Sequence, residues 1–93
     1  MMLYSGPMVK AEILPDDLYQ GWVYIEWLYP GEKKFQAVKD VKRIEKLIRD
    51  QKFKGWLASS EKDHTTMHKI LAKMGAFLYQ QNDHALYFMK EVI

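Results

Sequence analysis

The stretch that decides the fold is Phe53–Lys90, which reads FKGWLASSEKDHTTMHKILAKMGAFLYQQNDHALYFMK. It begins with an apolar run that is typical of a buried strand, and a polar loop follows at residues 59–64. Apolar residues then recur at helical spacing, at Met67, Ile70, Leu71 and Met74. Gly75 suits the left-handed position after a helix C-terminus. The remainder predicts two strands, near residues 76–79 and 85–89, joined by a turn.

The chain before this stretch predicts two further strands and a longer helix. Residues 8–14 alternate between the two faces of a half-buried strand. Residues 22–29 are apolar on both faces, as in an interior strand that is covered on both sides. A helix is predicted over residues 35–50, with one apolar face formed by Ala37, Val41, Ile44 and Ile48. Strand, helix and strand with short links predict a right-handed βαβ unit, whose strands are parallel.

Several details refine this prediction. Asp63 or Thr65 can cap the short helix. Glu45 and Arg49, four residues apart, can form an ion pair on the polar side of the long helix. The strand at residues 85–89 is apolar on both faces, so we expect it inside the sheet and not at its edge. The predicted fold class is therefore α/β (α+β), a single domain with a twisted mixed sheet of about five strands and two helices.

Length and composition limit the class of protein. The chain has 93 residues, which suits one small domain over residues 1–93, and it has no cysteine, which excludes disulfides and thiolate metal sites. It contains no apolar run as long as a membrane-spanning helix. Residues 1–7 lack the charged and apolar regions of a signal peptide. We therefore expect a cytoplasmic protein with no membrane association.

Positive charge is concentrated in residues 33–54. This segment holds nine Lys and Arg residues against three Asp and Glu residues, a net charge of +6 in a chain of net charge +2. Such asymmetry can mark an anionic partner. A solvated helix face is the simpler explanation, because lysines on a helix usually face water. Nucleic-acid binding through a basic helix is thus left open as a function but is not favoured.

Two short motifs resemble a known superfamily. Lys73–Gly75, followed by Phe77 after one inserted alanine, resembles the end of a late helix in GNAT-type N-acetyltransferases. Tyr87–Lys90 resembles the end of their last strand. Together with the order of the elements, the resemblance covers about residues 8–93. It implies the C-terminal half of an acyl-CoA N-acyltransferase-like fold.

The resemblance also implies a site for acetyl-CoA. The strand at residues 22–29 corresponds to the one whose splayed end receives the pantetheine arm, and residues 30–34 correspond to the pyrophosphate loop. The implied cofactor-binding residues are Tyr29, Gly31, Lys33 and Lys34. A helix that begins after this loop offers phosphates its unpaired N–H groups and a partial positive charge.

Three departures from the family pattern count against an ordinary enzyme. The loop has a single glycine, Gly31, and the neighbouring Glu32 would repel phosphate. Leu71 stands where the family often has a tyrosine as general acid, and leucine cannot transfer a proton. The family's first strands and helices, which build the acceptor side of the site, are absent from the predicted elements.

Glu26 and His64 are the candidate catalytic residues. A carboxylate on a half-buried strand near a cofactor cleft can act as a general base, although a salt bridge is the simpler role for Glu26. Imidazole exchanges protons near neutral pH, so His64 is the other candidate base. His64 and His68 have the spacing of some zinc sites, but Thr65 stands where the HExxH motif has Glu. No metal site is therefore expected.

The sequence leaves three functions open and does not decide whether the chain is an enzyme. The favoured function is a non-catalytic or degenerate GNAT-like domain that binds a protein partner or forms a homodimer, without a cofactor. The first alternative is a minimal N-acetyltransferase that depends on acetyl-CoA. The second alternative is nucleic-acid binding through the basic helix. Compact chains of this kind also suit a phage or mobile-element origin.

Overall fold

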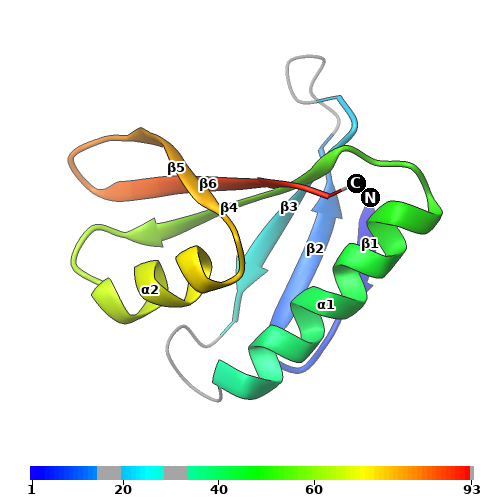
Figure 1. Ribbon diagram of the computed structural model, residues 1–93, viewed down its shortest axis with the longest axis horizontal. Coiled ribbons are helices and arrows are strands. Elements are labelled where there is room, and N and C mark those ends of the chain that lie inside the picture. Colours follow the sequence, from blue (N-terminus) through cyan, green and yellow to red (C-terminus); the bar gives the residue numbers. More distant parts are fainter. Residues whose placement is uncertain (15–19, 29–33, 93) are drawn as a thin grey trace.

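The computed structural model describes residues 1–14, 20–28 and 34–92, except for the side chain of Lys34. These residues form six strands and two helices (Figure 1): β1 (Met2–Ser5), β2 (Val9–Ile13), β3 (Trp22–Trp27), α1 (Lys34–Asp50), β4 (Gly55–Glu61), α2 (Thr65–Lys73), β5 (Phe77–Gln81) and β6 (Ala85–Glu91). The strands make one sheet in the order β1-β2-β3-β4-β6-β5. Among the described helices, none is long and apolar enough to cross a membrane.

The pairing of the strands confirms the predicted fold class. β3 and β4 are parallel and are joined through α1, as a βαβ unit requires. The other neighbouring strands are antiparallel, so the sheet is mixed. β3 and β6 both lie inside the sheet, which agrees with the apolar character of their two faces.

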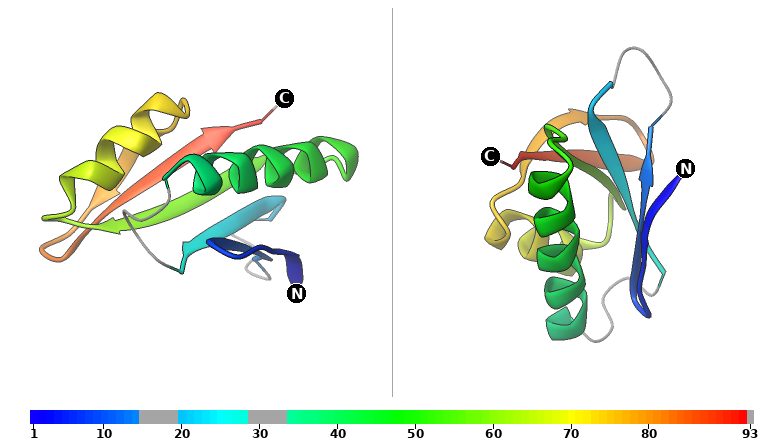
Figure 2. Two further views of the ribbon diagram at one scale, coloured as in Figure 1. Left: turned by 90° about the horizontal axis from the view of Figure 1, so that it is seen from below. Right: turned by 90° about the vertical axis from the view of Figure 1, so that its right-hand side faces the viewer.

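Both helices lie on the same face of the sheet (Figure 2). α1 buries the predicted stripe of Ala37, Val41, Ile44 and Ile48, and these side chains join the core formed by β2, β3 and β4. Trp56 of β4 is fully buried in that core. α2 contributes Met67 and Leu71 as its buried residues and ends at Gly75, whose φ of +91° confirms the predicted left-handed position.

Two polar side chains of α1 are also buried against the sheet. The Glu45 carboxylate accepts a hydrogen bond from Trp56 Nε1 at 2.9 Å and forms an ion pair with Lys90 Nζ at 2.8 Å. The Asp40 carboxylate accepts a hydrogen bond from the Tyr4 hydroxyl at 2.9 Å. Tyr4 also hydrogen-bonds to Arg43 and thereby raises the pKa of that guanidinium above its ordinary value. These bonds fix α1 to β1, β4 and β6.

Two predictions about local structure are wrong, and one strand was not predicted. The sheet has a sixth strand, β1, which is only four residues long and has an irregular register with β2, so its sequence shows no clean alternation. Glu45 is buried and not on the polar side of α1, because Trp56 and Lys90 supply partners for its carboxylate. His64, and not Asp63 or Thr65, occupies the N-cap of α2, and no side chain there makes a capping hydrogen bond.

The second face of the sheet is not covered by any described helix (Figure 2). Side chains alternate along a strand, so residues in register with Leu57 lie opposite the helices. One such row crosses five strands through Glu12, Tyr24, Leu57, Met89 and Phe77. Trp22 lies over Gly55, where an added Cβ would come within 2.7 Å of the indole ring. We call this surface the open face, defined by Trp22, Tyr24, Leu57, Phe77, Tyr87 and Met89.

Candidate functional site

A cleft opens where β3 and β4 part. The two strands are paired from Trp22–Gly55 to Ile25–Ala58, after which β3 ends at Trp27 while β4 continues to Glu61. Parallel strands that stop pairing leave backbone and side-chain groups exposed between them. Between these strand ends and the start of α2 lies a pocket of about 610 Å³. We call this pocket the cleft.

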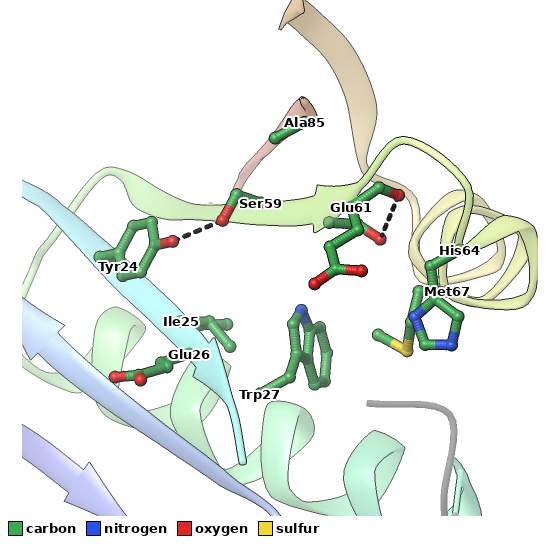
Figure 3. A pocket seen from close by; sticks show the side chains of 10 residues that line it. Tyr24, Ile25, Glu26, Trp27, Ser59, Glu61, His64, Met67 and Ala85 are labelled. Atoms are coloured by element: carbon green, nitrogen blue, oxygen red, sulfur yellow. Dashed lines mark hydrogen bonds between the residues drawn. The ribbon is translucent and has the colours of Figure 1, made fainter. Parts of the chain in front are cut away.

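The walls of the cleft come from both faces of the sheet (Figure 3). The hydroxyls of Tyr24 and Ser59 are hydrogen-bonded at 2.6 Å and bridge the two strands on the open-face side. Ile25 and Trp27 line the cleft from the side of the helices, and Met67 of α2 joins them. The cleft therefore passes through the sheet instead of lying on one of its surfaces.

Trp27 presents an unpaired donor to the cleft. Its Nε1 atom is buried and has no hydrogen-bond partner among the described residues. Figure 3 shows this nitrogen directed toward the side of the cleft where Glu61 lies. A buried N–H group without an acceptor costs about 1–3 kcal/mol, so a ligand that brings a carbonyl oxygen to this point gains affinity. The sequence gives no sign of this role, because Trp27 reads there as one apolar residue of an interior strand.

The two histidines near the cleft differ in their surroundings. His64 is partly buried, occupies the N-cap of α2 and lines the cleft. His68 lies one turn further on, with Nε2 at 2.9 Å from the backbone oxygen of Glu61 and its ring against Phe88. Within the described ranges, no three His, Asp or Glu side chains are grouped as metal ligands. Among the described histidines, His64 is thus the one that lines the cleft.

Glu26 lies at the edge of the cleft. Its carboxylate forms an ion pair with Lys10 Nζ of β2 at 3.1 Å, and its side chain is 52% exposed. In Figure 3 the carboxylate points toward β2 and away from Trp27 and His64. The structure therefore does not bring the two candidate bases together. The catalytic roles of Glu26 and His64 stay predictions.

The predicted phosphate-binding residues fall largely outside the described part of the chain. This applies to Tyr29, Gly31 and Lys33, while Lys34 is the first residue of α1 and only its backbone is described. α1 therefore begins directly after the predicted loop. The assignment of these four residues to cofactor binding stays a prediction.

A second hollow of about 370 Å³ lies between α1 and α2. Its apolar lining is Phe35 and Val38 from α1 with Ile70 and Met74 from α2, and Thr66, Lys69 and Lys73 add polar groups. Phe35 is 77% exposed, which is unusual for a large aromatic side chain. We call this hollow the helix groove. Sequence reasoning did not find it, because two helices that are distant in sequence form it only after folding.

Comparison with solved structures gives the fold an independent test. A GNAT-family acetyltransferase from Listeria monocytogenes 4b F2365 matches with a TM-score of 0.71 and 11% identity, over 90% of this chain and 57% of that one. A protein assigned as phosphinothricin N-acetyltransferase matches with a TM-score of 0.70 and 9% identity, over 91% and 59%. SsHAT matches with a TM-score of 0.63 and 8% identity, over 77% and 36%.

The chain has a GNAT-type fold. This confirms the resemblance that was inferred from the sequence motifs. At these identities the likeness concerns the fold alone, and the chain spans between about a third and three fifths of the length of the structures that it matches. No protein-family model matches the chain, and no curated protein matches its sequence significantly.

Proposed function

We propose that the cleft binds an acyl-CoA, with acetyl-CoA as the first candidate. The observation that carries the proposal is the parting of two parallel strands around a buried, unpartnered Trp27 N–H group. A pantetheine arm is narrow and carries amide and thioester oxygens, which are hydrogen-bond acceptors. The bound molecule would supply an acyl group in the form of a thioester. The Trp27 indole would donate to a carbonyl oxygen and orient it within the cleft.

The helix groove offers a site for the nucleotide part of the same acyl-CoA molecule. Lys69 and Lys73 offer two ammonium groups for phosphates, and the exposed ring of Phe35 offers a stacking surface for a base. The N-terminus of α1 begins close to Phe35 and adds backbone N–H groups that favour anions. The groove and the cleft both adjoin the N-terminal part of α2, through Thr66 and His64 respectively, so one extended ligand could reach both.

N-acetyl transfer is the activity that these residues support best. An amine acceptor must lose a proton as it reacts, and the side chains in the cleft that could serve as general base are His64 and the carboxylates of Glu26 and Glu61.

A non-catalytic binding module is the second candidate. Leu71, at the position where the resemblance implies a proton-donating tyrosine, is fully buried and packs in the core. It contributes apolar packing and cannot protonate a leaving thiolate. If no other residue protonates the leaving thiolate, the cleft binds an acyl-CoA without transferring its acyl group.

Calorimetric titration with acetyl-CoA, with CoA for comparison, tests the binding. The matched variants are Trp27→Phe, which removes one N–H group from the cleft, and Trp22→Phe, which removes the same group from the open face. We expect micromolar binding that Trp27→Phe weakens about two- to tenfold, the range of one hydrogen bond, and that Trp22→Phe leaves unchanged. No binding at millimolar ligand, or equal affinity in both variants, contradicts the proposal.

A shortened ligand tests the helix groove separately. The double variant Lys69→Ala/Lys73→Ala should weaken the binding of acetyl-CoA. The binding of acetyl-pantetheine, which has no nucleotide, should be unaffected. Lys42→Ala/Lys46→Ala removes two exposed charges from α1 and is the matched control. If both double variants weaken acetyl-CoA binding equally, the positive charge of the lysines acts at long range and the helix groove is not the nucleotide site.

Release of free thiol in the presence of amine acceptors separates the two candidates. The N-acetyltransferase predicts release that rises with acceptor concentration and falls at least tenfold in His64→Ala. Binding without thiol release from any acceptor supports the non-catalytic module instead.

A further inference from the structure

The open face carries an apolar floor without a cover among the described residues. Leu57 at its centre is flanked by Tyr24 of β3 and Met89 of β6, which lie in register with it. Leu57 is itself buried at 4% exposure beneath these neighbours, whereas Trp22, Tyr24 and Met89 are partly exposed and Phe77 at the edge is 55% exposed. Sheets whose two faces are both apolar are ordinarily covered on both sides. The floor therefore has the character of a contact surface.

Acidic side chains surround this floor. In the described strands, the acids that alternate onto the open face are Glu12, Glu26, Glu61 and Glu91, and Lys10 is the one cation there. Lys10 is already paired with Glu26 at 3.1 Å and lies 4.0 Å from Glu12. A cluster of exposed basic residues lies instead on α1, at Lys39, Lys42, Arg43 and Lys46. The open face is thus apolar in the middle and negative at its margin.

We propose that the open face docks a basic amphipathic helix of a partner polypeptide. The floor spans β3, β4 and β6, and strands lie about 4.8 Å apart, so its width of about 10 Å equals the diameter of one helix. An apolar stripe on such a helix would cover Trp22, Tyr24 and Met89, which are partly exposed. Lysines or arginines on its flanks would face the acids at the margin.

The negative charge of the margin also argues against a homodimer in which two open faces pack against each other. Such a dimer would set each acidic margin against its own like charges, which is unfavourable. A basic helix meets no such repulsion. This inference does not depend on acyl-CoA binding, because it concerns the face of the sheet and not the cleft.

The test uses two synthetic peptides of about 18 residues, long enough to form a helix on binding. One has leucine on one face and lysine on the other, and the second has glutamate in place of lysine. The indole N–H signals in a ¹H–¹⁵N spectrum report the site, because Trp22 lies on the open face and Trp56 lies under α1. We expect the leucine–lysine peptide to shift the Trp22 signal, to leave Trp56 in place and to bind more weakly in about 1 M salt, where charges are screened beyond about 3 Å.

Charge-reversal variants locate the margin. Glu12→Lys/Glu91→Lys should weaken the binding of the leucine–lysine peptide about tenfold, since two attractive charge pairs become repulsive. The control is Asp50→Lys, which reverses an exposed acid at the end of α1, on the covered side of the sheet. The proposal is overturned if the two peptides bind equally, if the control weakens binding as much, or if Trp22 shifts on raising the protein concentration alone.

Discussion

The two faces of the sheet differ in what holds their side chains in place. On the covered face, Trp56, Ile44 and Ile48 are fully buried beneath α1, and the buried carboxylate of Glu45 has two partners. On the open face, Trp22 rests on Gly55 and is only partly buried. The comparison teaches that most of the stability of this small domain comes from one face. The other face is left available for binding.

The cleft lies at the boundary between these two surfaces. Trp27 approaches it from the covered side, while Tyr24 and Ser59 close it from the open side. A ligand in the cleft would therefore contact side chains from both faces of the sheet. This arrangement links the proposed acyl-CoA site with the proposed docking surface without making either depend on the other.

The largest expected effect on stability comes from replacing a tryptophan of the covered face by alanine. Trp56→Ala should lower the free energy of unfolding by about 3–5 kcal/mol, because it empties a buried site and removes one of the two partners of the Glu45 carboxylate. Trp22→Ala should cost less than half as much, because the ring is partly exposed. Urea unfolding measures both. Equal costs would show that the open face is as important for stability as the covered face.

Removing the buried carboxylate should have the second largest effect. Glu45→Ala leaves the Trp56 indole and the Lys90 ammonium without their acceptor, and we expect a loss of about 2 kcal/mol. Glu91→Ala, on the exposed end of β6, is the control and should change stability by less than about 0.5 kcal/mol. A Glu45→Ala variant as stable as the wild type would mean that the buried pair contributes nothing.

The smallest effect is expected on the exposed margin of the open face. Phe77→Lys replaces a side chain that is 55% exposed, and the free energy of unfolding should stay within about 0.5 kcal/mol of the wild-type value. The same change should weaken the binding of the leucine–lysine peptide, because it removes apolar contact and adds a positive charge that repels the lysines of the peptide. A large loss of stability would place Phe77 in the core and narrow the proposed docking surface.

Much of the fold could be predicted because its signals are local. The stripe of Ala37, Val41, Ile44 and Ile48 repeats at helical spacing, and the glycine at position 75 marks a helix end within a few residues. The apolar character of residues 22–29 and 85–89 indicated interior strands, which the sheet order confirms. Local spacing was therefore sufficient for the βαβ unit and for the order of the elements.

The site could not be predicted to the same extent, because its parts are distant in sequence. The partners of Glu45 are 11 residues away at Trp56 and on the last strand at Lys90, so nothing near Glu45 indicates that it is buried. The cleft exists because pairing stops at Ile25–Ala58, a property of two strands together. Trp27 looked like any core aromatic, and only the surroundings of its N–H group distinguish it.

The most direct test of the account is the indole region of the ¹H–¹⁵N spectrum during titration with acetyl-CoA. The chain has three tryptophans, and each one reports a different region: Trp22 the open face, Trp27 the cleft and Trp56 the covered core. The account predicts that the Trp27 signal shifts and saturates while the Trp22 and Trp56 signals stay in place. A Trp27 signal that does not move at millimolar acetyl-CoA would contradict the claim that the cleft binds an acyl-CoA.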